Sequence, residues 1–379
     1  MFIHETHLPQ VLTPEAYTSL DHLDKEMGAL FHDSWQFIGT TADIPNDGDY
    51  LTFELFGKPL IVWNKDGQLH TFLNVCPHRF SMLSHHKCGH AAERLACQYH
   101  GWEFDETGNT RKIPDAKSFK PMKQGELGLV KYHTETIGQL IFVNTSENPP
   151  PLRDQLGPGY QVAEDLFSAD RRWFLTLDYE VECNWKVKIE NSLESYHVDF
   201  IHTKTFATSP DAEICFHELE DGWTSYTTTQ TAPRKLDDYL NRLVHRLARK
   251  EFDQEYQHFH YYPTMMCGKM GLFTFAETVF PITPHRTRII TMLFVYSGPP
   301  ARLGSRLLFR ALKNWGRKFF QTVVDEDTSV MPDIQKGMIS GQQPSRGLIS
   351  VREERLWHFQ EYIRSNTMDH SKQTVGASS

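Results

Sequence analysis

From residue 50 to residue 144, apolar residues alternate with polar ones or form short runs between turn residues. The clearest examples are YLTFELF, LIVWN and LHTFLNV, which are separated by Gly57-Lys58-Pro59 and Lys65-Asp66-Gly67. A period of two, interrupted by tight turns, predicts short antiparallel strands. The pattern ends near the run IGQLIFVN and the breaker Pro149-Pro150-Pro151, so it predicts a β-domain over residues 45–148.

The rest of the chain mixes helical and strand patterns. Near the N-terminus, Thr13-Pro14-Glu15 supplies a cap and an N1 proline ahead of apolar residues at helical spacing, namely Leu20, Leu23, Met27 and Leu30. After residue 170, the segments 174–182, 274–282 and 286–296 predict strands, and several helices are predicted between and after them. The sequence therefore predicts an α+β protein.

A basic amphipathic helix is predicted over residues 234–252, RKLDDYLNRLVHRLARKEF. The simplest interpretation is a solvated face over an apolar stripe, and the alternative is a docking or lid role. The last residues, 371–379, are expected to form a disordered tail.

Composition limits the kind of protein. The length of 379 residues is typical of two or three domains, and 39% hydrophobic residues suffice for a large core. A formal net charge of -9 argues against binding nucleic acid or an anionic membrane. The chain shows neither an apolar run of roughly 18 residues nor a signal-peptide pattern, so we expect a cytoplasmic protein. In a reducing compartment, clustered Cys and His are more often metal ligands or catalysts than disulfides.

Two cysteine and histidine pairs lie in the predicted β-domain. Cys76 and His78 are separated by one residue, and Cys97 and His100 are separated by two. A tetrahedral zinc site could use this set. However, C-x-H and C-x2-H arms at this separation are typical of a Rieske [2Fe-2S] centre, in which two Cys hold one iron and two His hold the other.

A second C-x-H sequence, Cys88-Gly89-His90, lies between these arms. Too few residues separate His90 from Cys97 for the strand that two opposed hairpin tips require. We therefore expect Cys88 and His90 to be loop residues, with Gly89 turning the chain.

The segment 184–202 contains a second candidate metal set, Glu194, His197 and His202. On a helix, Glu194 and His197 share a face, and His202 can approach beyond the helix end. Two such histidines with one distant carboxylate form the 2-His-1-carboxylate set, which leaves positions on iron(II) open for dioxygen and substrate. A histidine pair alone would more often be structural, but the Rieske-type set favours the metal interpretation.

The distant carboxylate can be chosen by helical periodicity. Asp327 has apolar residues at helical offsets, namely Val323, Val324, Val330, Met331, Ile334 and Met338, whereas Asp325 has polar ones. Asp327 should therefore face the core and Asp325 should face water, in a helix that Pro332 interrupts. A buried acid is costly unless it is paired or metal-bound, so Asp327 is the predicted third ligand.

Taken together, these motifs resemble the catalytic alpha subunit of Rieske-type nonhaem iron oxygenases over nearly the whole chain. The residues that carry the resemblance are Asn74-Val75-Cys76-Pro77-His78-Arg79, Cys97-Gln98-Tyr99-His100-Gly101-Trp102, Asn184-Trp185-Lys186, Glu190-Asn191, Tyr196-His197, His202 and Glu326-Asp327.

The resemblance implies a Rieske domain at 45–148, inserted near the N-terminus of a larger helix-grip catalytic domain with an antiparallel sheet. Residues 1–44 form the N-terminal helical part of that catalytic domain, and residues 149–370 form the rest. The implied cofactors are a [2Fe-2S] cluster and mononuclear Fe(II). The implied assembly is a head-to-tail homotrimer in which the cluster of one subunit faces the iron of its neighbour.

Glu194 departs from most ring hydroxylases, which have Asp as the carboxylate that bridges a cluster histidine to an iron histidine. Glu at this position resembles the branch that acts on carnitine, betaines and choline, although it could also have arisen within an aromatic-acid branch. Asn191 is expected near the iron, or alternatively in a helix-start hydrogen bond.

The chain has no glycine-rich nucleotide fingerprint, so the expected electron donor is a separate NAD(P)H-dependent reductase or a ferredoxin. The expected reaction is hydroxylation by O2 of a small N-methylated or quaternary ammonium compound, leading to demethylation or C–N cleavage. The alternatives are ring hydroxylation or O-demethylation of an aromatic compound, a Rieske electron carrier and a zinc-stabilised binding module. Candidate pocket residues are Tyr261, Tyr262, Met265 and Phe273, which could also be ordinary core residues.

Overall fold

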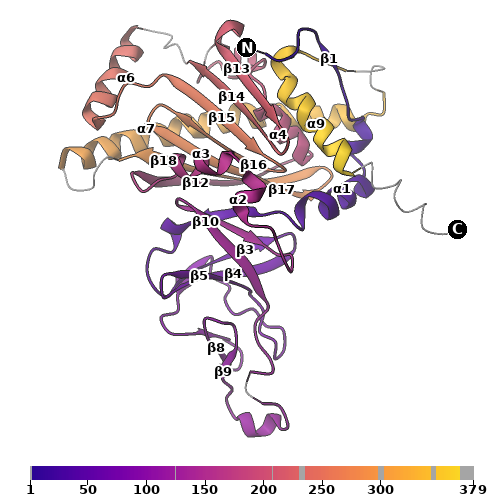
Figure 1. Ribbon diagram of the computed structural model, residues 1–379, viewed down its shortest axis with the longest axis vertical. Coiled ribbons are helices and arrows are strands. Elements are labelled where there is room, and N and C mark those ends of the chain that lie inside the picture. Colours follow the sequence, from indigo (N-terminus) through magenta and orange to yellow (C-terminus); the bar gives the residue numbers. More distant parts are fainter. Residues whose placement is uncertain are drawn as a thin grey trace, which may run out of the picture. The chain divides into compact units, whose positions relative to one another are not determined.

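The computed structural model describes residues 2–123, 125–206, 208–229, 235–297, 303–342 and 347–367. The chain divides into two compact units (Figure 1). The smaller unit comprises His32–Gln155, and the larger unit comprises Met1–Phe31 and Leu156–Ser379.

The smaller unit consists mainly of antiparallel strands. One sheet has the order β2-β11-β10-β5-β4-β3-β6, and a second has the order β7-β8-β9. The strands are β2 (Gln36–Thr40), β3 (Asp49–Leu55), β4 (Lys58–Lys65), β5 (Gln68–Leu73), β6 (Cys88–His90), β7 (Leu95–Ala96), β8 (Glu103–Phe104), β9 (Thr110–Lys112), β10 (Lys131–Ile137) and β11 (Leu140–Asn144). The three alternating segments predicted as strands are β3, β4 and β5.

The smaller unit begins earlier than residue 45 because β2 pairs with β11. Its end, at Gln155, also lies beyond residue 148. The sequence pattern did not place residues 36–40 in this sheet, since their pairing partner lies about 100 residues further along the chain.

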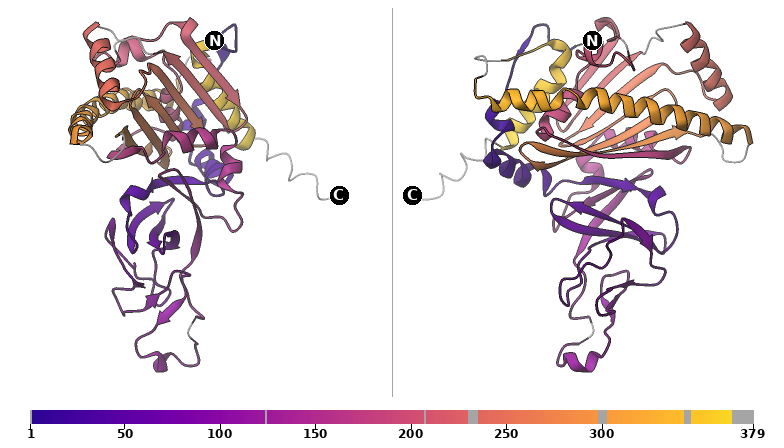
Figure 2. Two further views of the ribbon diagram at one scale, coloured as in Figure 1. Left: turned by 60° about the vertical axis from the view of Figure 1, so that its left-hand side comes forward. Right: turned by 180° about the vertical axis from the view of Figure 1, so that it is seen from behind.

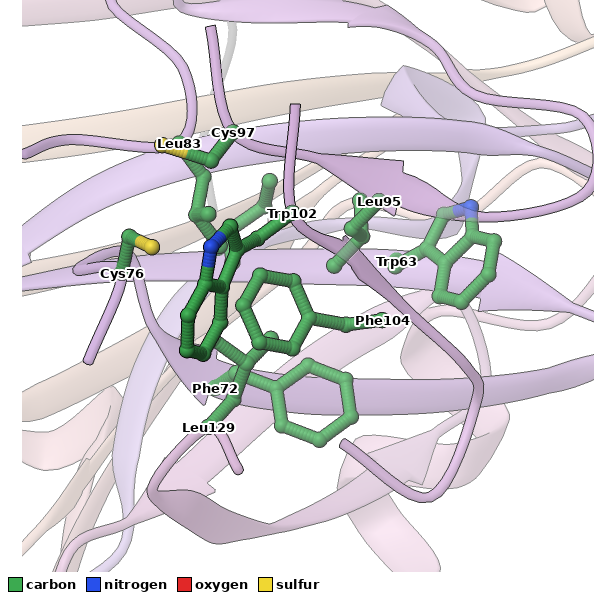
Figure 3. Packing of buried hydrophobic residues seen from close by; sticks show 10 residues of the cluster. Trp63, Phe72, Cys76, Leu83, Leu95, Cys97, Trp102, Phe104 and Leu129 are labelled. Atoms are coloured by element: carbon green, nitrogen blue, oxygen red, sulfur yellow. The ribbon is translucent and has the colours of Figure 1, made fainter. Parts of the chain in front are cut away.

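Aromatic residues form the core of the smaller unit beside two cysteines. Trp63, Phe72, Trp102 and Phe104 are almost completely buried. Figure 3 shows Cys76 and Cys97 at one edge of this cluster, next to Trp102. The rigid aromatic cluster therefore supports both thiols.

The larger unit contains an antiparallel sheet with the order β12-β18-β17-β16-β15-β14-β13. Its strands are β12 (Arg171–Val181), β13 (Cys215–Glu220), β14 (Trp223–Thr229), β15 (Glu255–Tyr261), β16 (Met265–Met270), β17 (Phe273–Thr283) and β18 (Arg286–Tyr296), and a short pair joins β1 (Leu8–Pro9) to β19 (Leu348–Ile349). The helices are α1 (Leu20–Glu26), α2 (Leu152–Leu156), α3 (Gly159–Leu166), α4 (Trp185–Ser192), α5 (Val198–Ile201), α6 (Lys235–Ala248), α7 (Leu303–Thr328), α8 (Met331–Ile339) and α9 (Glu354–Thr367).

The two faces of this sheet are covered by different helices. Helix α7 crosses one face, as the view from behind in Figure 2 shows, and its Leu312 packs with Phe273 and Leu293. Helix α3 covers the opposite face, where the Tyr261 hydroxyl donates to the Gly159 carbonyl at 3.0 Å. A long helix across an antiparallel sheet confirms the α+β, helix-grip prediction.

Two predicted helices differ in detail from the structure. The N-terminal helix is divided into a 3-10 turn at Pro14–Tyr17, α1, and a π-helical turn at Met27–Phe31. Pro332 does not interrupt a helix, because α7 ends at Thr328 and Pro332 lies in the first turn of α8, where a missing N–H costs little.

The basic helix expected at 234–252 is α6, although residue 234 and the predicted tail 371–379 lie outside the described residues. Within the described part of the chain, no helix is long and apolar enough to cross a membrane.

Candidate functional site: two donor sets

Two tight loops in the smaller unit carry the Cys and His pairs. In one, the Cys76 N–H donates to the Ser81 carbonyl at 2.8 Å, and in the other the Cys97 N–H donates to the Trp102 carbonyl at 2.8 Å. Each loop turns through a residue with positive φ, Phe80 at 58° and Gly101 at 70°. The two loops therefore have similar backbone conformations, and each loop presents one thiol and one imidazole.

The donor atoms of these loops suit a Rieske cluster. Cys76 and Cys97 are 1% and 3% exposed, whereas His100 is exposed and its ring centroid lies 4.6 Å from that of His78. Burial raises the pKa of the Cys76 thiol to about 11, although the backbone N–H groups of His78 and Arg79 donate to its sulfur. Such N–H···S contacts compensate a thiolate bound to iron, so the set fits a cluster with sulfurs inside and imidazoles outside.

Cys88 and His90 are excluded from this donor set by their position. They lie in edge strand β6 rather than in a loop, and the His90 Nδ1 atom lies 2.9 Å from an Asp49 carboxylate oxygen. Gly89 has no positive φ; instead, a Cβ atom there would lie 2.3 Å from the Tyr50 hydroxyl oxygen. The prediction that Gly89 turns the chain was wrong. Glycine is required at this position because a side chain would clash with Tyr50.

Helix α4 leads to the second donor set and is unusually polar for a buried helix. Asn184 caps it by accepting from the Lys186 N–H at 3.1 Å. Inside the unit, Lys186 pairs with Glu26 at 2.6 Å and Lys188 pairs with Glu277 at 2.7 Å. Because an unpaired buried charge is costly, these pairs fix the helix against α1 and β17.

Glu190 on the same helix accepts from the Tyr17 hydroxyl at 2.5 Å and from the Gln360 amide at 3.0 Å. Burial raises the pKa of Glu190 to about 7, against the opposing effect of these donors. The helix is thereby also joined to the N-terminal and C-terminal segments of the larger unit.

Glu194 and His197 do not lie on a helix, contrary to the prediction, because α4 ends at Ser192 and α5 begins at Val198. The turn between the helices nevertheless brings them into contact. His197 Nδ1 lies 2.5 Å from Glu194 Oε1, and the backbone N–H groups of Tyr196 and His197 donate to Oε2. This contact fixes the ring of His197 with its Nε2 atom pointing away.

The three predicted ligands converge. His197 and His202 flank the single turn α5, and their Nε2 atoms are 3.2 Å apart. Asp327, near the end of α7, places Oδ1 at 3.1 Å from His202 Nε2 and at 3.5 Å from His197 Nε2. One donor atom from each residue lies within 4.8 Å of the other two.

The arrangement of these three atoms suits coordination of one cation better than hydrogen bonds among them. Asp327 Oδ1 is buried and makes no properly directed hydrogen bond to a described residue. Burial alone would raise the pKa of the Asp327 carboxyl, but both imidazoles and the Lys188 ammonium hold it well below its usual range. An anionic oxygen facing two Nε2 atoms fits a divalent iron.

Asp325 faces away, as its polar neighbours predicted: it is exposed, and it accepts from the Gln321 amide at 2.9 Å. Glu326, which lies between the two aspartates, was named with the family motifs, but the sequence argument gave it no role. Its Oε2 atom lies 3.1 Å from His202 Nδ1 and also accepts from the Thr205 hydroxyl at 2.6 Å. Glu326 therefore orients His202 as Glu194 orients His197.

Asn191 lies in the last turn of α4, so a helix-start hydrogen bond is wrong for it. Its Oδ1 atom is buried and has no hydrogen-bond partner among the described residues.

The four residues of the predicted aromatic wall do not share one face of the sheet. Tyr261 lies on the α3 face of the sheet, Phe273 packs in the core under α7, and the Tyr262 hydroxyl lies 2.7 Å from His358 Nδ1. Met265 is buried in β16. Strand alternation, applied to β15, would have separated Tyr261 from Tyr256 and His258, since successive side chains point to opposite faces.

The face of the sheet beneath α7 carries a row of rings instead. Tyr226 pairs directly with His258, and a Cβ atom on Gly268, the next residue across, would lie 2.8 Å from the Phe275 ring. Glu277 lies on the same face, paired with Thr291 and bonded to Lys188. Aromatic and polar groups therefore share the face on which Lys188 approaches Asp327.

Two family matches cover most of the chain. Residues 170–368 match the ring hydroxylating alpha subunit (catalytic domain), and residues 34–132 match the Rieske [2Fe-2S] domain. These families carry mononuclear iron and a Rieske cluster, respectively, and the two donor sets fit those groups.

Curated relatives include oxygenases with different substrates. The carnitine monooxygenase oxygenase subunit of Acinetobacter baumannii is 25% identical over 352 residues, which cover 89% of this chain and 88% of that protein. The glycine betaine monooxygenase oxygenase subunit of Pseudomonas aeruginosa is 30% identical over 54% of this chain and 47% of that protein. Toluate 1,2-dioxygenase subunit alpha of Pseudomonas putida is 29% identical over 53% of this chain and 46% of that protein. The last two alignments thus span about half of each relative.

Solved structures share the fold. A quaternary ammonium Rieske monooxygenase in complex with an inhibitor matches with a TM-score of 0.78 and 22% identity, covering 95% of this chain and 96% of that chain. Naphthalene 1,2-dioxygenase with bound indole matches with a TM-score of 0.73 and 19% identity, covering 98% and 95%.

We expect Cys97→Ala to abolish the visible and paramagnetic spectra of the cluster while the protein stays folded, because thiolates anchor one of the two irons. Circular dichroism reports the fold, and Cys88→Ala is the matched control, expected to keep the full spectrum. A full-intensity Rieske signal from Cys97→Ala would refute the assignment.

Asp327→Ala is expected to lose the mononuclear iron and turnover while it keeps the cluster, because it removes the only carboxylate that faces both Nε2 atoms in the described site. Iron and sulfide analysis distinguishes the two centres. Asp325→Ala, two residues away on the exposed side, should retain both. Loss of iron from Asp325→Ala with normal iron in Asp327→Ala would overturn the choice of ligand.

Proposed function

The chain belongs to the Rieske-type ring-hydroxylating alpha subunits, and from this membership we propose that it oxidises a small N-methylated or quaternary ammonium compound. The observation that carries the oxygenase assignment is the second donor set of His197, His202 and Asp327. A Rieske electron carrier needs only the Cys and His arms of the smaller unit, and a zinc-stabilised module would leave the second set without a role.

We assign Cys76, His78, Cys97 and His100 to the cluster, and His197, His202 and Asp327 to iron(II). When bound, the cluster supplies single electrons and the iron supplies open positions for dioxygen. In the metal-loaded site, carboxylates that accept from both Nδ1 atoms would fix the neutral imidazoles in the tautomer that leaves each Nε2 free to bind the metal.

The net reaction for an N-methyl group is balanced by dioxygen, two electrons and two protons. One oxygen atom enters a methyl C–H bond to give a carbinolamine, and the other leaves as water. The carbinolamine then breaks its C–N bond and releases formaldehyde and the demethylated amine. Hydroxylation of another carbon next to nitrogen cleaves a C–N bond in the same manner. The electrons come from NAD(P)H through a separate reductase or a ferredoxin.

Three observations support an ammonium substrate. Relatives that align with 89%, 54% and 92% of this chain are named for carnitine, glycine betaine and choline, respectively. Glu194 takes the place that Asp has in most ring hydroxylases. The rings of Tyr226, Tyr256 and Phe275 lie on the metal-facing side of the sheet, and a cation over such rings gains about 0.5–2 kcal/mol.

A second candidate is oxidation of an aromatic carboxylate, which is favoured by the relative named for toluate. The ring row would then contact an aromatic substrate by its faces or edges. The two candidates differ in the charge next to the oxidised carbon.

We also propose a cytoplasmic homotrimer in which Glu194 bridges His197 to a cluster histidine of the neighbouring subunit. Two large apolar side chains on this segment, Tyr196 and Phe200, are 57% and 80% exposed. In the smaller unit, Phe80 and Tyr99, next to the cluster histidines in sequence, are 80% and 56% exposed. Exposed apolar groups at both places suit burial between subunits.

The proposed function is tested by supplying the reconstituted protein with NADH and a generic reductase, and by measuring oxygen uptake and product in parallel. Glycine betaine, carnitine, choline, tertiary amines and benzoate-type acids form the panel. Product-coupled uptake with an amine is the expected result. Turnover of aromatic acids with no turnover of any amine would replace this function with the second candidate.

Glu194→Gln should retain both metals but slow turnover by at least about 100-fold, because an amide cannot accept from two imidazoles as a carboxylate does. The decisive readout is the rate of cluster oxidation in a single turnover with oxygen and substrate. Glu213→Gln, an exposed glutamate of the same unit, is the control. A wild-type rate in Glu194→Gln would remove the bridge.

A further inference from the structure

Arg355, at the start of α9, is a fully buried arginine without a carboxylate partner. It is 1% exposed. Its Nε atom donates to the Thr224 hydroxyl at 3.1 Å, and its Nη2 atom donates to His258 Nδ1 at 3.1 Å and to the Thr224 carbonyl at 3.5 Å. Within the described residues, no ion pair involves Arg355, and Nη1 has no hydrogen-bond partner.

The groups around Arg355 are neutral. Burial and the guanidinium itself hold the pKa of His258 well below its usual range. Tyr226, Tyr256 and Tyr262 are the acidic groups that act on Arg355 electrostatically, and burial keeps each of them protonated by raising its pKa. Burial lowers the pKa of Arg355 to about 10, so it is a cation at neutral pH whose charge is not balanced.

Nearby carboxylates are already committed to other partners. Glu354 accepts from the N–H groups of Ile3 and His4, and one of its oxygens lies 2.8 Å from His217 Nδ1. Glu277 is paired with Lys188, and Asp327 faces the two iron-site imidazoles. Burying an unpaired cation is energetically unfavourable. We therefore expect Arg355 to bind a counter-ion in the active protein.

Arg355 lies on the same side of the sheet as the metal ligands. It bonds to His258, whose direct cross-strand neighbour is Tyr226 and whose same-face neighbour along β15 is Tyr256. The charges of Arg355, Asp327 and Glu277 all act on the pKa of the Tyr256 hydroxyl. By strand register, Tyr256, His258 and Glu277 share one face of the sheet, and Glu277 pairs there with Lys188, which also acts on Asp327.

We propose that Arg355 binds a carboxylate of the substrate, so that the substrate spans from this guanidinium, past Tyr256, to the His197, His202 and Asp327 set. The inference rests on the proposed function and narrows its substrate class to betaine-like zwitterions, with ammonium and carboxylate in one molecule. An aminoalcohol such as choline would leave Arg355 unpaired. The free Nη1 and the partly used Nη2 suit a carboxylate, for which the planar guanidinium is the preferred partner.

Such a subsite would let the protein distinguish zwitterions from simple cations. The ammonium group gains from the ring faces, and the carboxylate gains from Arg355. Of these two interactions, an aromatic carboxylate would make only the contact with Arg355. A zwitterion and an aromatic acid can therefore be distinguished by experiment.

The first test compares glycine betaine with choline, which have the same trimethylammonium group but carry a carboxylate and a hydroxymethyl group, respectively. Calorimetric titration of the iron-loaded wild-type protein should show about 10- to 100-fold tighter binding of glycine betaine. This comparison requires no variant. Equal affinity for the two ligands would refute the carboxylate subsite.

The second test uses Arg355→Gln and Arg355→Lys. Arg355→Gln should remove the preference for glycine betaine while it leaves the affinity for choline unchanged, and Arg355→Lys should restore part of the preference. The matched control is Arg364→Gln, which changes an exposed arginine of the same helix, paired with Glu361. Unchanged binding of glycine betaine to a folded Arg355→Gln protein would overturn the proposal.

A third ligand, benzoate, separates this inference from the proposed function. If benzoate binds in an Arg355-dependent manner and no amine binds, the carboxylate subsite stands and the ammonium function fails. If choline and glycine betaine bind with equal affinity and both are oxidised, the ammonium function stands and the carboxylate subsite fails.

Discussion

Buried ion pairs on one short helix hold the catalytic part of the larger unit in place. Lys186 and Lys188 project from α4 in opposite directions to glutamates of α1 and β17, and Glu190 joins the helix to both ends of the chain. Removing one partner of such a pair costs about 3–5 kcal/mol, so α4 cannot shift alone. The turn that carries Glu194 and His197 begins where α4 ends, and its position follows from these pairs.

Both donor sets use the same physical arrangement. Each has an anionic or thiol group held in the interior and imidazoles oriented by the chain around it. In the smaller unit, the backbone closes two loops around the thiols, and the stacked ring of Trp102 supports His78 at a centroid distance of 5.0 Å. In the larger unit, carboxylates at the Nδ1 atoms orient both imidazoles. These directed contacts offset the free-energy cost of burying polar groups, and they leave the donor atoms available to metals.

The sequence predicted the features that depend on local patterns. Period-two alternation gave the strands of the smaller unit, and helical periodicity distinguished Asp327 from Asp325. Features that depend on distant partners were missed, including the pairing of β2 with β11 and the contact of Glu326 with His202. Arg355 was missed for the same reason. Its hydrogen-bond partner His258 lies in β15, about 100 residues earlier in the chain than α9. Tyr261 was placed on the wrong face because alternation within β15 was not applied.

We propose that one chain joins a Rieske cluster to an iron site that oxidises a zwitterionic amine. A single-turnover experiment tests this most directly: the protein is reduced chemically, freed of reductant and mixed with oxygen and glycine betaine, with no reductase present. We expect the cluster to become oxidised and up to about one equivalent of formaldehyde or another C–N cleavage product to form per iron site. Cluster oxidation without any product from glycine betaine or carnitine, or product from a protein whose cluster stays reduced, would contradict it.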